Sequence, residues 1–248
     1  DIGSYMVALD AKSGTEVWRV DRSEFRRSFS TPFLWKHDGI EELVVPGSLW
    51  VRSYDVNDGR QRWSVRGMAR VSNASPVAAD GVLLISSWNV GGDEGDRVEM
   101  EPFESFAAQN DANKDGFLIK DEFPKGPLKD RYSQLDADKD NKVSQSEYEQ
   151  MREMFVQAVN QIFAIKPGGT GDITSTHVVW QNNKHLPYVS SPVVANGRVC
   201  TMKNGGLASC YDARSGSPVY QGERVDASGD YYSSAVRSEE RRVGKECL

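Results

Sequence analysis

Ala8-Leu-Asp10-Ala-Lys-Ser-Gly14-Thr-Glu-Val-Trp18 is a unit that this chain repeats. It returns 45 residues later as Ser53-Tyr-Asp55-Val-Asn-Asp-Gly59-Arg-Gln-Arg-Trp63, and again as Cys210-Tyr-Asp212-Ala-Arg-Ser-Gly216-Ser-Pro-Val-Tyr220. In each copy an alternating apolar strand ends at Asp, a tight turn places Gly where φ can be positive, and a second strand ends at an aromatic residue. The unit predicts a β-hairpin with a bulky anchor. A weaker copy with a longer turn runs from Ala164 to Trp180.

A second hairpin signal precedes two of these copies. Ser75-Pro-Val-Ala-Ala-Asp80-Gly81-Val-Leu-Leu-Ile-Ser86 and Ser191-Pro-Val-Val-Ala-Asn196-Gly197-Arg-Val-Cys-Thr201 each place a turn dipeptide between apolar runs. Four strands in about 40 to 45 residues are typical of a propeller blade. We therefore expect the end of one blade, three full blades and the first strand of another at residues 231–236.

The repeated unit resembles the tryptophan-docking blades of the pyrroloquinoline-quinone (PQQ)-like β-propeller repeat family, over roughly residues 5–98 and 160–236. The resemblance implies a mainly β fold, a partial β-propeller of four-stranded antiparallel blades. It also implies that each anchoring aromatic residue packs against the neighbouring blade. Relatives of this type usually work outside the bacterial cytoplasm, so we expect a periplasmic or extracellular protein. Since a closed propeller has about 4 to 8 blades, we expect a fragment of a larger ring.

Two twelve-residue loops stand apart from this pattern. They read Asp111-Ala-Asn-Lys-Asp-Gly-Phe-Leu-Ile-Lys-Asp-Glu122 and Asp136-Ala-Asp-Lys-Asp-Asn-Lys-Val-Ser-Gln-Ser-Glu147, and helical periodicity flanks both. Calcium takes six to eight oxygen ligands, which an EF-hand loop supplies from positions 1, 3, 5, 7 (a backbone carbonyl) and 12 (a bidentate Glu). The sequence therefore predicts an inserted α-helical EF-hand pair with two Ca²⁺ sites. The expected ligands are Asp111, Asn113, Asp115, Phe117, Glu122, Asp136, Asp138, Asp140, Lys142 and Glu147.

The two loops differ in ways that predict different affinities. Gly116 meets the sharp bend at position 6 of the first loop, and Asn141, the next most tolerant residue, meets it in the second. Ser144 at position 9 can hold a bridging water, whereas Ile119 cannot. The second loop also has one more carboxylate among its ligands, so we expect it to bind Ca²⁺ more tightly. Leu118 and Val143 at position 8 are expected to pair the loops.

The formal charge of −6 lies in this segment. Residues 99–155 hold 14 acidic and 8 basic residues, whereas acidic and basic residues are equal in number elsewhere. Nucleic acid requires a Lys/Arg footprint, so no nucleic-acid partner is expected. No apolar run reaches the length of a membrane span. We expect blades in 1–98, the EF-hand pair in 99–156, replacing the turn between two neighbouring strands, and further blades in 157–236.

The two ends of the chain carry further expectations. The opening residues 5–10 read as the inside of a strand, which suggests a truncated N-terminus. Residues 237–248 are expected to be a non-native tail, because 237–247 resembles a translated sequencing-library adapter; the alternative is a genuine charged tail. Cys200 and Cys210 are symmetric about Asn204-Gly205-Gly206 and are expected to face each other across a hairpin, either as a disulfide or as buried thiols.

Catalysis is the open question at this point. The resemblance brings in quinone-dependent alcohol or sugar oxidoreductases, which use an axial calcium, an Asp base and two adjacent cysteines, but the sequence has no adjacent cysteine pair. PQQ is therefore a cofactor that these residues do not support. His37, His177 and His185 are scattered, and surface or strand-edge roles are favoured. We favour a non-catalytic scaffold that holds a protein or small ligand on a propeller face. Residues 184–188 and 226–232 are candidates for lining that face.

Overall fold

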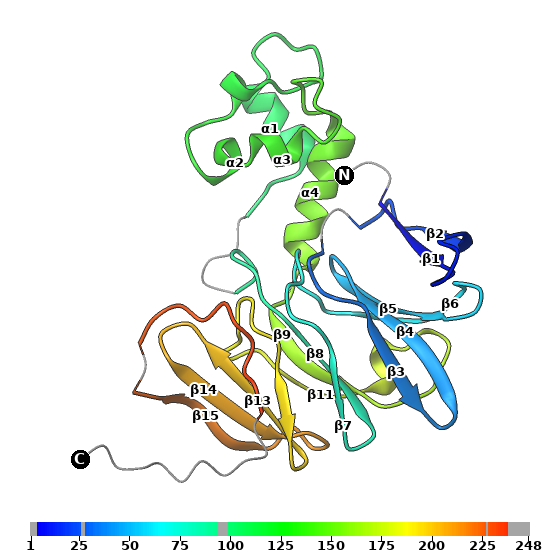
Figure 1. The fold of residues 1–248 in the computed structure, drawn as a ribbon. Helices are drawn as coiled ribbons and strands as arrows, with labels where there is room; N and C mark the ends of the chain where they lie inside the picture. The colour runs from blue at the N-terminus through cyan, green and yellow to red at the C-terminus, as the bar shows by residue number, and fades with distance from the viewer. Residues whose placement is uncertain (1–3, 26–27, 94–98, 227, 238–248) are drawn as a thin grey trace.

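The computed structural model describes residues 4–25, 28–93, 99–226 and 228–237. Its strands form an N-terminal hairpin and three four-stranded antiparallel blades (Figure 1). The hairpin is β1 (Tyr5–Leu9) and β2 (Glu16–Asp21). The blade strands are β3 (Phe33–His37), β4 (Ile40–Pro46), β5 (Trp50–Asp55) and β6 (Gln61–Arg66); β7 (Val77–Ala79), β8 (Val82–Ser87), β9 (Gln161–Ile165) and β11 (Val178–Asn182); and β12 (Val193–Ala195), β13 (Arg198–Lys203), β14 (Leu207–Asp212) and β15 (Pro218–Arg224).

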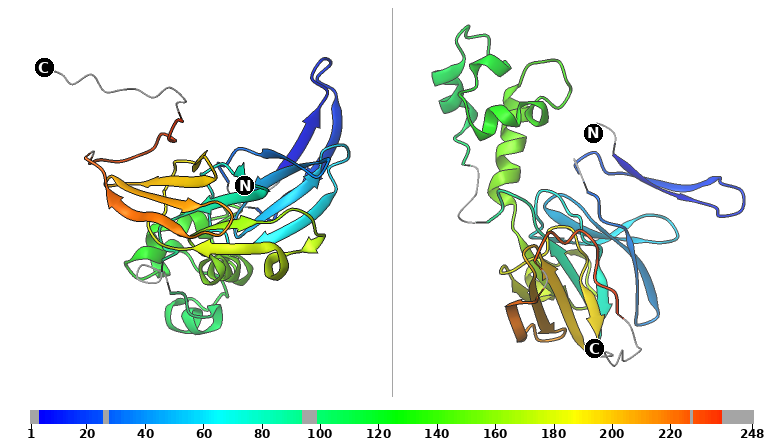
Figure 2. Two further views of the ribbon diagram at one scale, coloured as in Figure 1. Left: turned by 90° about the horizontal axis from the view of Figure 1, so that it is seen from below. Right: turned by 60° about the vertical axis from the view of Figure 1, so that its left-hand side comes forward.

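The blades lie side by side in an open arc, and the β1–β2 hairpin stands next to the first of them (Figure 2). The predicted turns close as type I′ hairpins require, because Asp80 and Gly81 both have positive φ, as do Asn196 and Gly197. The prediction of a mainly β fold made of four-stranded antiparallel blades is thus confirmed.

The predicted strand at residues 231–236 is wrong. This segment has no strand structure, and it instead follows the turn of the preceding blade. The backbone N–H of Gly205 donates to the Gly229 carbonyl at 2.8 Å, and the backbone N–H of Tyr231 donates to Asn204 Oδ1 at 3.0 Å. A β-strand needs a neighbouring strand for its backbone hydrogen bonds. Here the backbone N–H of Tyr231 bonds to a side chain of the Asn204-Gly205-Gly206 turn instead.

Two tryptophans join neighbouring blades in the same way. Trp18 Nε1 donates to the Val56 carbonyl at 3.0 Å, and Trp180 Nε1 donates to the Ala213 carbonyl at 3.0 Å. Each ring lies against the glycine of the turn it reaches: a Cβ on Gly59 would meet Trp18 at 2.8 Å, and one on Gly216 would meet Trp180 at 2.5 Å. The glycine is therefore required for its positive φ and for the close approach of the ring.

Trp63 departs from this arrangement. The turn that should receive it, in the weaker copy, instead folds back as β10 (Gly171–Asp172), which pairs in parallel with β6, and as α5 (Thr174–His177). Trp63 is buried in a cluster between two blades that includes Phe163 and Ile173. Because the weaker copy lacks the Asp-x-x-Ser-Gly turn, the indole N–H finds a partner within its own blade.

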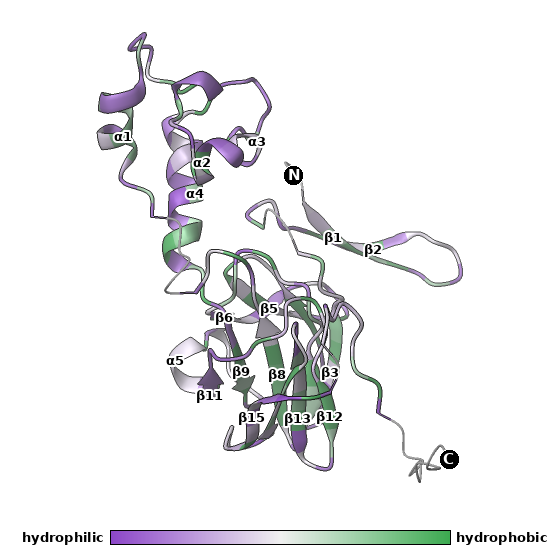
Figure 3. Ribbon diagram, turned by 90° about the vertical axis from the view of Figure 1, so that its left-hand side faces the viewer, coloured by the Kyte–Doolittle hydropathy of each residue, from purple (hydrophilic) through white to green (hydrophobic). Residues whose placement is uncertain are grey.

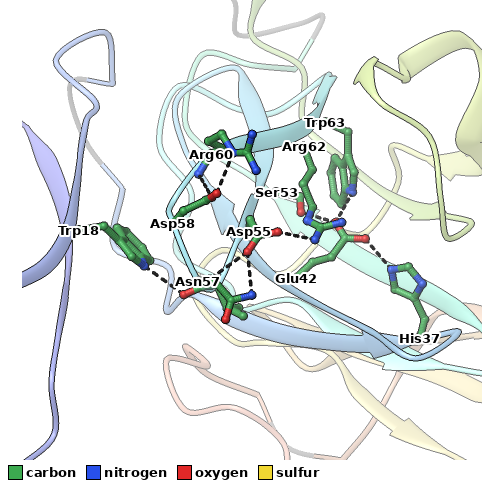
Figure 4. Close-up of polar contacts among 11 residues, drawn as sticks. Trp18, His37, Glu42, Ser53, Asp55, Asn57, Asp58, Arg60, Arg62 and Trp63 are labelled. Atoms are coloured by element: carbon green, nitrogen blue, oxygen red, sulfur yellow. Dashed lines mark hydrogen bonds and ion pairs between the residues drawn. The ribbon is translucent and has the colours of Figure 1, made fainter.

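That partner is Glu42, a carboxylate buried in β4 (Figure 4). Trp63 Nε1 donates to Glu42 Oε2 at 2.5 Å, Ser53 donates its hydroxyl to the same oxygen, and His37 Nε2 lies 2.6 Å from Glu42 Oε1. His37, Glu42, Ser53 and Trp63 come from β3, β4, β5 and β6 in turn. A single polar row therefore crosses the whole blade in its interior, and His37 takes its expected place at an edge strand.

We expect Gly216→Ala to destabilise the protein more than Gly14→Ala. Both glycines have nearly the same positive φ, but a Cβ at Gly14 meets no atom within 4 Å. Gly14→Ala should cost only the backbone strain of about 1 kcal/mol, whereas Gly216→Ala should add an overpacking cost of about 1–3 kcal/mol. Urea unfolding of the two variants measures the difference, and equal losses would contradict the docking argument.

Glu42→Ala should lower the free energy of unfolding by about 3 kcal/mol or more, because it leaves buried donors without an acceptor. Glu41→Ala is the matched control, since Glu41 is exposed and its ion pair with Lys36 lies at the surface. That variant should change stability by less than about 1 kcal/mol. Similar losses for both variants in chemical denaturation would show that the buried row is dispensable.

The other helical elements of the described chain lie between β8 and β9 in the sequence. They are α1 (Phe103–Asn110), the 3₁₀ turn η1 (Lys120–Glu122), α2 (Pro127–Asp130), α3 (Tyr132–Leu135) and α4 (Gln145–Gln157). β8 and β9 pair antiparallel from Leu83↔Ile165 to Ser87↔Gln161, so the helical segment leaves and re-enters the blade at one point. It stands away from the sheets on α4 (Figure 1), and hydrophilic residues make up much of its ribbon (Figure 3).

A separate apolar core holds the helical segment together. Aromatic residues from both sides of the loops meet there, including Phe106 with Phe123 at 5.4 Å and Phe103 with Tyr148 at 5.5 Å between ring centroids. The four-residue α2 and α3 and the single turn η1 are shorter than the helices of a regular pair. Contacts between helices are shared by three pairs: α1 with α4, α2 with α3, and α3 with α4.

Cys200 and Cys210 face each other on β13 and β14 and form a disulfide, with Cα atoms 4.1 Å apart. Of the two alternatives that the sequence leaves open, the structure has the bonded one. Within the described ranges, none of the helices has the length and apolarity needed to cross a bilayer. The adapter-like residues 238–247 lie outside the described part of the chain.

Candidate metal centre

The two acidic loops follow the same backbone path. Positions 4 and 6 have positive φ in both, at Lys114 (57°) and Gly116 (81°) in the first loop and at Lys139 (64°) and Asn141 (66°) in the second. Position 6 is therefore left-handed whether glycine or asparagine occupies it, as the sequence predicts. Shared backbone dihedrals place the side chains of equivalent positions in equivalent orientations.

Backbone N–H groups hold one oxygen of each aspartate at the first position. Gly116 N–H donates to Asp111 Oδ2 at 3.0 Å, and Asn141 N–H donates to Asp136 Oδ2 at 3.1 Å. The other oxygen, Oδ1, is buried in both residues and has no hydrogen-bond partner among the described residues. Burying a carboxylate oxygen without a hydrogen-bond donor costs free energy. Each loop therefore has one strong acceptor whose partner is missing among the described residues.

The glutamates at position 12 are fixed at both oxygens. Glu122 accepts from Ala112 N–H at 3.0 Å and from Ile119 N–H at 2.9 Å. Glu147 accepts from Ala137 N–H and Ser144 N–H, both at 2.8 Å. This arrangement spreads each carboxylate across the closing end of its loop. Each glutamate thus has both oxygens oriented by backbone N–H groups of its own loop.

Positions 3 and 5 are held by the backbone two residues onward. Asn113 Oδ1 and Asp138 Oδ1 accept from the N–H of position 5 at 3.0 and 3.2 Å. Asp115 Oδ1 and Asp140 Oδ1 accept from the N–H of position 7 at 2.9 and 2.8 Å. Position 7 itself, Phe117 or Lys142, contributes only a backbone carbonyl to the predicted ligand set.

Three carboxylates of the second loop lie close together. Oxygens of Asp136, Asp138 and Glu147 lie within 4.8 Å of one another, whereas Asp140 is outside that group. Calcium ligands at about 2.3–2.6 Å from an ion are separated by up to about 5 Å across it, so the three oxygens can share one ion. Within the described residues, no other such group of carboxylates is found, and the first loop has Asn113 where the second has Asp138.

Asn113 and Lys142 both contact Asp115, one of the predicted ligands of the first loop. Asn113 replaces one carboxylate, and its Nδ2 donates to Asp115 Oδ2 at 3.1 Å. Lys142 Nζ from the second loop lies 3.8 Å from the same oxygen. Asp115 is thereby turned toward two donors within the protein. The first loop thus keeps the predicted residues but engages part of its ligand set in other contacts.

Hydrogen bonds also set the protonation of the loops. Burial raises the pKa of Glu147, but the hydrogen bonds from Ser144 and Ala137 outweigh it and leave the pKa below its usual value. The backbone N–H of Phe117 lowers the pKa of Asp115. Both carboxylates are therefore ionised at neutral pH, which metal ligation requires.

The loops are joined to each other at position 8. Leu118 N–H donates to the Val143 carbonyl at 3.0 Å, and Val143 N–H donates to the Leu118 carbonyl at 2.9 Å, which confirms the predicted pairing. Tyr132, which the sequence reasoning did not single out, donates its hydroxyl to the Asn141 carbonyl at 2.7 Å. Ser144 begins α4 as its N-cap and donates its hydroxyl to Glu147 Oε2 at 2.8 Å.

Residues 2–99 match a family model described as "Outer membrane protein assembly factor BamB". Three solved structures are similar to the chain: BamB from Moraxella catarrhalis (15% identity, TM-score 0.46), the quinohemoprotein alcohol dehydrogenase ADHIIG from Pseudomonas putida HK5 (13%, 0.42) and a europium-containing methanol dehydrogenase (11%, 0.30). Matches cover 94%, 87% and 87% of this chain but only 49%, 31% and 47% of those chains. The chain thus spans less than two thirds of each structure.

No curated protein sequence matches the chain.

We expect Glu147→Gln to remove a tighter Ca²⁺ site than Glu122→Gln. The second loop has the three converging carboxylates, whereas Asp115 in the first loop is engaged by Asn113 and Lys142. Titration calorimetry of the wild type should resolve two binding events, and Glu147→Gln should abolish the tighter one. Loss of the tighter event in Glu122→Gln would reverse this order.

The family match covers the N-terminal blades, and the helical segment lies outside it. Together with the antiparallel sheets of the blades, the match supports PQQ-like propeller repeats in residues 2–99.

Proposed function

We propose that this chain binds two Ca²⁺ ions through EF-hand loops inserted in a non-catalytic PQQ-like propeller segment. The observation that carries the proposal is the buried Oδ1 atom of Asp111 and of Asp136, each without a partner among the described residues. A divalent cation at the centre of each loop satisfies that oxygen. The ligands are Asp111, Asn113, Asp115, the Phe117 carbonyl and Glu122 in one loop, and Asp136, Asp138, Asp140, the Lys142 carbonyl and Glu147 in the other.

The donor set fits calcium better than other common ions. Every proposed ligand atom is a hard oxygen, and no histidine or cysteine occurs in residues 99–156. Zinc and copper favour nitrogen and sulfur ligands, whereas calcium accepts carboxylates and carbonyls in a flexible shell. The glutamate at position 12 presents both oxygens along the loop, which suits the larger calcium ion rather than the strict octahedron of magnesium.

Calcium acts here as a structural ion in the first place. Three carboxylates that lie within 4.8 Å of one another repel when no cation is present. Glu147 also belongs to the first turn of α4, the helix that connects the second loop to β9. Binding at the second loop thereby stabilises the N-terminal end of the helix on which the whole helical segment stands.

The surrounding protein is proposed to be an extracytoplasmic interaction scaffold. The Cys200–Cys210 disulfide fits an oxidising compartment, and such compartments also contain enough calcium for EF-hands of moderate affinity. The family match to an outer membrane protein assembly factor supports a binding role for the blades. The ligand is a protein or a small molecule bound on the face of the blades.

We expect Ca²⁺ to raise the melting temperature of the wild-type chain. Ligand that binds only the folded state adds about 2.7 kcal/mol of stability when its free concentration is 100 times Kd. The double variant Glu122→Gln/Glu147→Gln should lose this rise, whereas Glu104→Gln, on the exposed side of α1, should keep it. Calorimetric melting in calcium and in EDTA makes the comparison.

An equal rise in the double variant would show that calcium binds elsewhere.

The non-catalytic part of the proposal has its own test. Full-length protein supplied with PQQ and calcium should show no dye-linked alcohol oxidation, and turnover would identify an oxidoreductase instead.

A further inference from the structure

A cavity of about 710 Å³ lies between the helical segment and the loops at one end of the blades. One wall comes from the second acidic loop and α4, through Asp136, Asp138 and Met154. The opposite wall comes from blade loops that are distant in sequence, through Phe29, Arg70 and Tyr188. Cavities of about 300–1,000 Å³ are the usual size for small-molecule sites. Tyr188 belongs to one of the two segments predicted to line a propeller face; residues 226–232 are not among the lining residues described.

Arg70 is the charged group on the blade side of this cavity. Its NH2 donates to Asn89 Oδ1 at 2.8 Å and to the Val90 carbonyl at 3.4 Å, and its Nε–H is buried without a partner among the described residues. No carboxylate within the described ranges forms an ion pair with it. The guanidinium instead lies 4.5 Å from the centre of the Phe155 ring, so its position is fixed by packing.

The positive charge of a second guanidinium, that of Arg131, disfavours the charged form of Arg70. Arg131 also lies near the Phe155 ring, with its guanidinium carbon 5.9 Å from the ring centroid. Burial lowers the pKa of Arg70, and the positive charge of Arg131 lowers it further. Arg70 lines the cavity and its charge has no carboxylate partner among the described residues, so its guanidinium attracts an anion there.

The calcium loop forms part of the same cavity. Asp136 and Asp138 face it together with Lys139, so the charged side chains that line it are Arg70, Lys139 and these two carboxylates. Their formal charges cancel. A Ca²⁺ ion held by the second loop offsets two of the four negative charges of its carboxylates, Asp136, Asp138, Asp140 and Glu147. Calcium therefore weakens the repulsion that Asp136 and Asp138 exert on an anion.

We propose that this cavity binds an organic anion, a carboxylate or phosphate carried on an apolar body, and that calcium in the second loop strengthens the binding. The anionic group meets Arg70, and the apolar body lies against Phe29, Tyr188 and Met154. The calcium dependence rests on the proposed function, whereas the anion site rests on the cavity and Arg70 alone. Coupling is reciprocal, so the anion must also strengthen calcium binding.

The test is titration calorimetry of the full chain with phenylacetate and with phenyl phosphate, each in calcium and in EDTA. The two anions separate carboxylate from phosphate preference, and phenylacetamide is the uncharged control. We expect at least one anion to bind at least about tenfold more tightly than phenylacetamide, and calcium to increase that affinity about fivefold or more. Glu147→Gln should remove the increase.

Arg70→Gln should weaken anion binding at least about tenfold and leave direct calcium titration of the loops unchanged. Arg60→Gln is the control, because Arg60 is exposed on a distant turn and pairs only with Asp58 among the contacts described. If Arg70→Gln does not fold, the comparison of each anion with phenylacetamide on the wild type decides the question.

Equal binding of anions and phenylacetamide, or unchanged anion binding in folded Arg70→Gln, would overturn the site. Anion binding that ignores calcium, in protein whose loops do bind calcium, would overturn the coupling only. Absence of calcium binding would overturn the proposed function, and the EDTA titrations would still decide the anion site.

Discussion

The antiparallel ladder between β8 and β9 is the constraint on which the rest of this structure depends. Both strands are buried along their full length and contribute to two cores at once. Leu83, Ile85 and Phe163 face one neighbouring blade, and Leu84 and Ile162 face the other. The same ladder is open at the end where the helical segment is inserted, so the pairing joins three blades and also anchors the insertion.

The blade accommodates the helical segment without any change in its strand pairing. The two ends of the segment are brought together by the pairing of β8 with β9, and it has an apolar core of its own. Within that core the loops are already shaped by backbone N–H groups, which orient one oxygen of every aspartate at the first position and both oxygens of each closing glutamate. Preorganisation of this kind leaves the electrostatic repulsion among carboxylates as the main term that a cation has to offset.

The tryptophans between blades satisfy their indole N–H groups in two different ways. Trp18 and Trp180 place an indole N–H on a backbone carbonyl of the next blade, where a glycine lets the ring approach. Trp63 has no such turn to reach, and its N–H is satisfied by a buried carboxylate within its own blade. Both arrangements satisfy the indole donor and bury the ring. Only the first transmits position from one blade to the next through a directed hydrogen bond.

The amino-acid sequence by itself determined the hairpin turns, the blade repeat and the internal geometry of the acidic loops, because each depends on residues close together in the chain. Asp80-Gly81, Asn196-Gly197 and Gly116 specify their turns through local φ preferences. The pairing of Leu118 with Val143 follows from the same spacing. Tertiary structure alone decided what depends on distant segments: the burial of Glu42 beneath Trp63, the path of residues 231–236 along their own blade, and the cavity where Arg70 and Tyr188 face the second loop. No local sequence pattern predicts these features, because each depends on contacts between elements that are distant in the sequence and meet only in the folded chain.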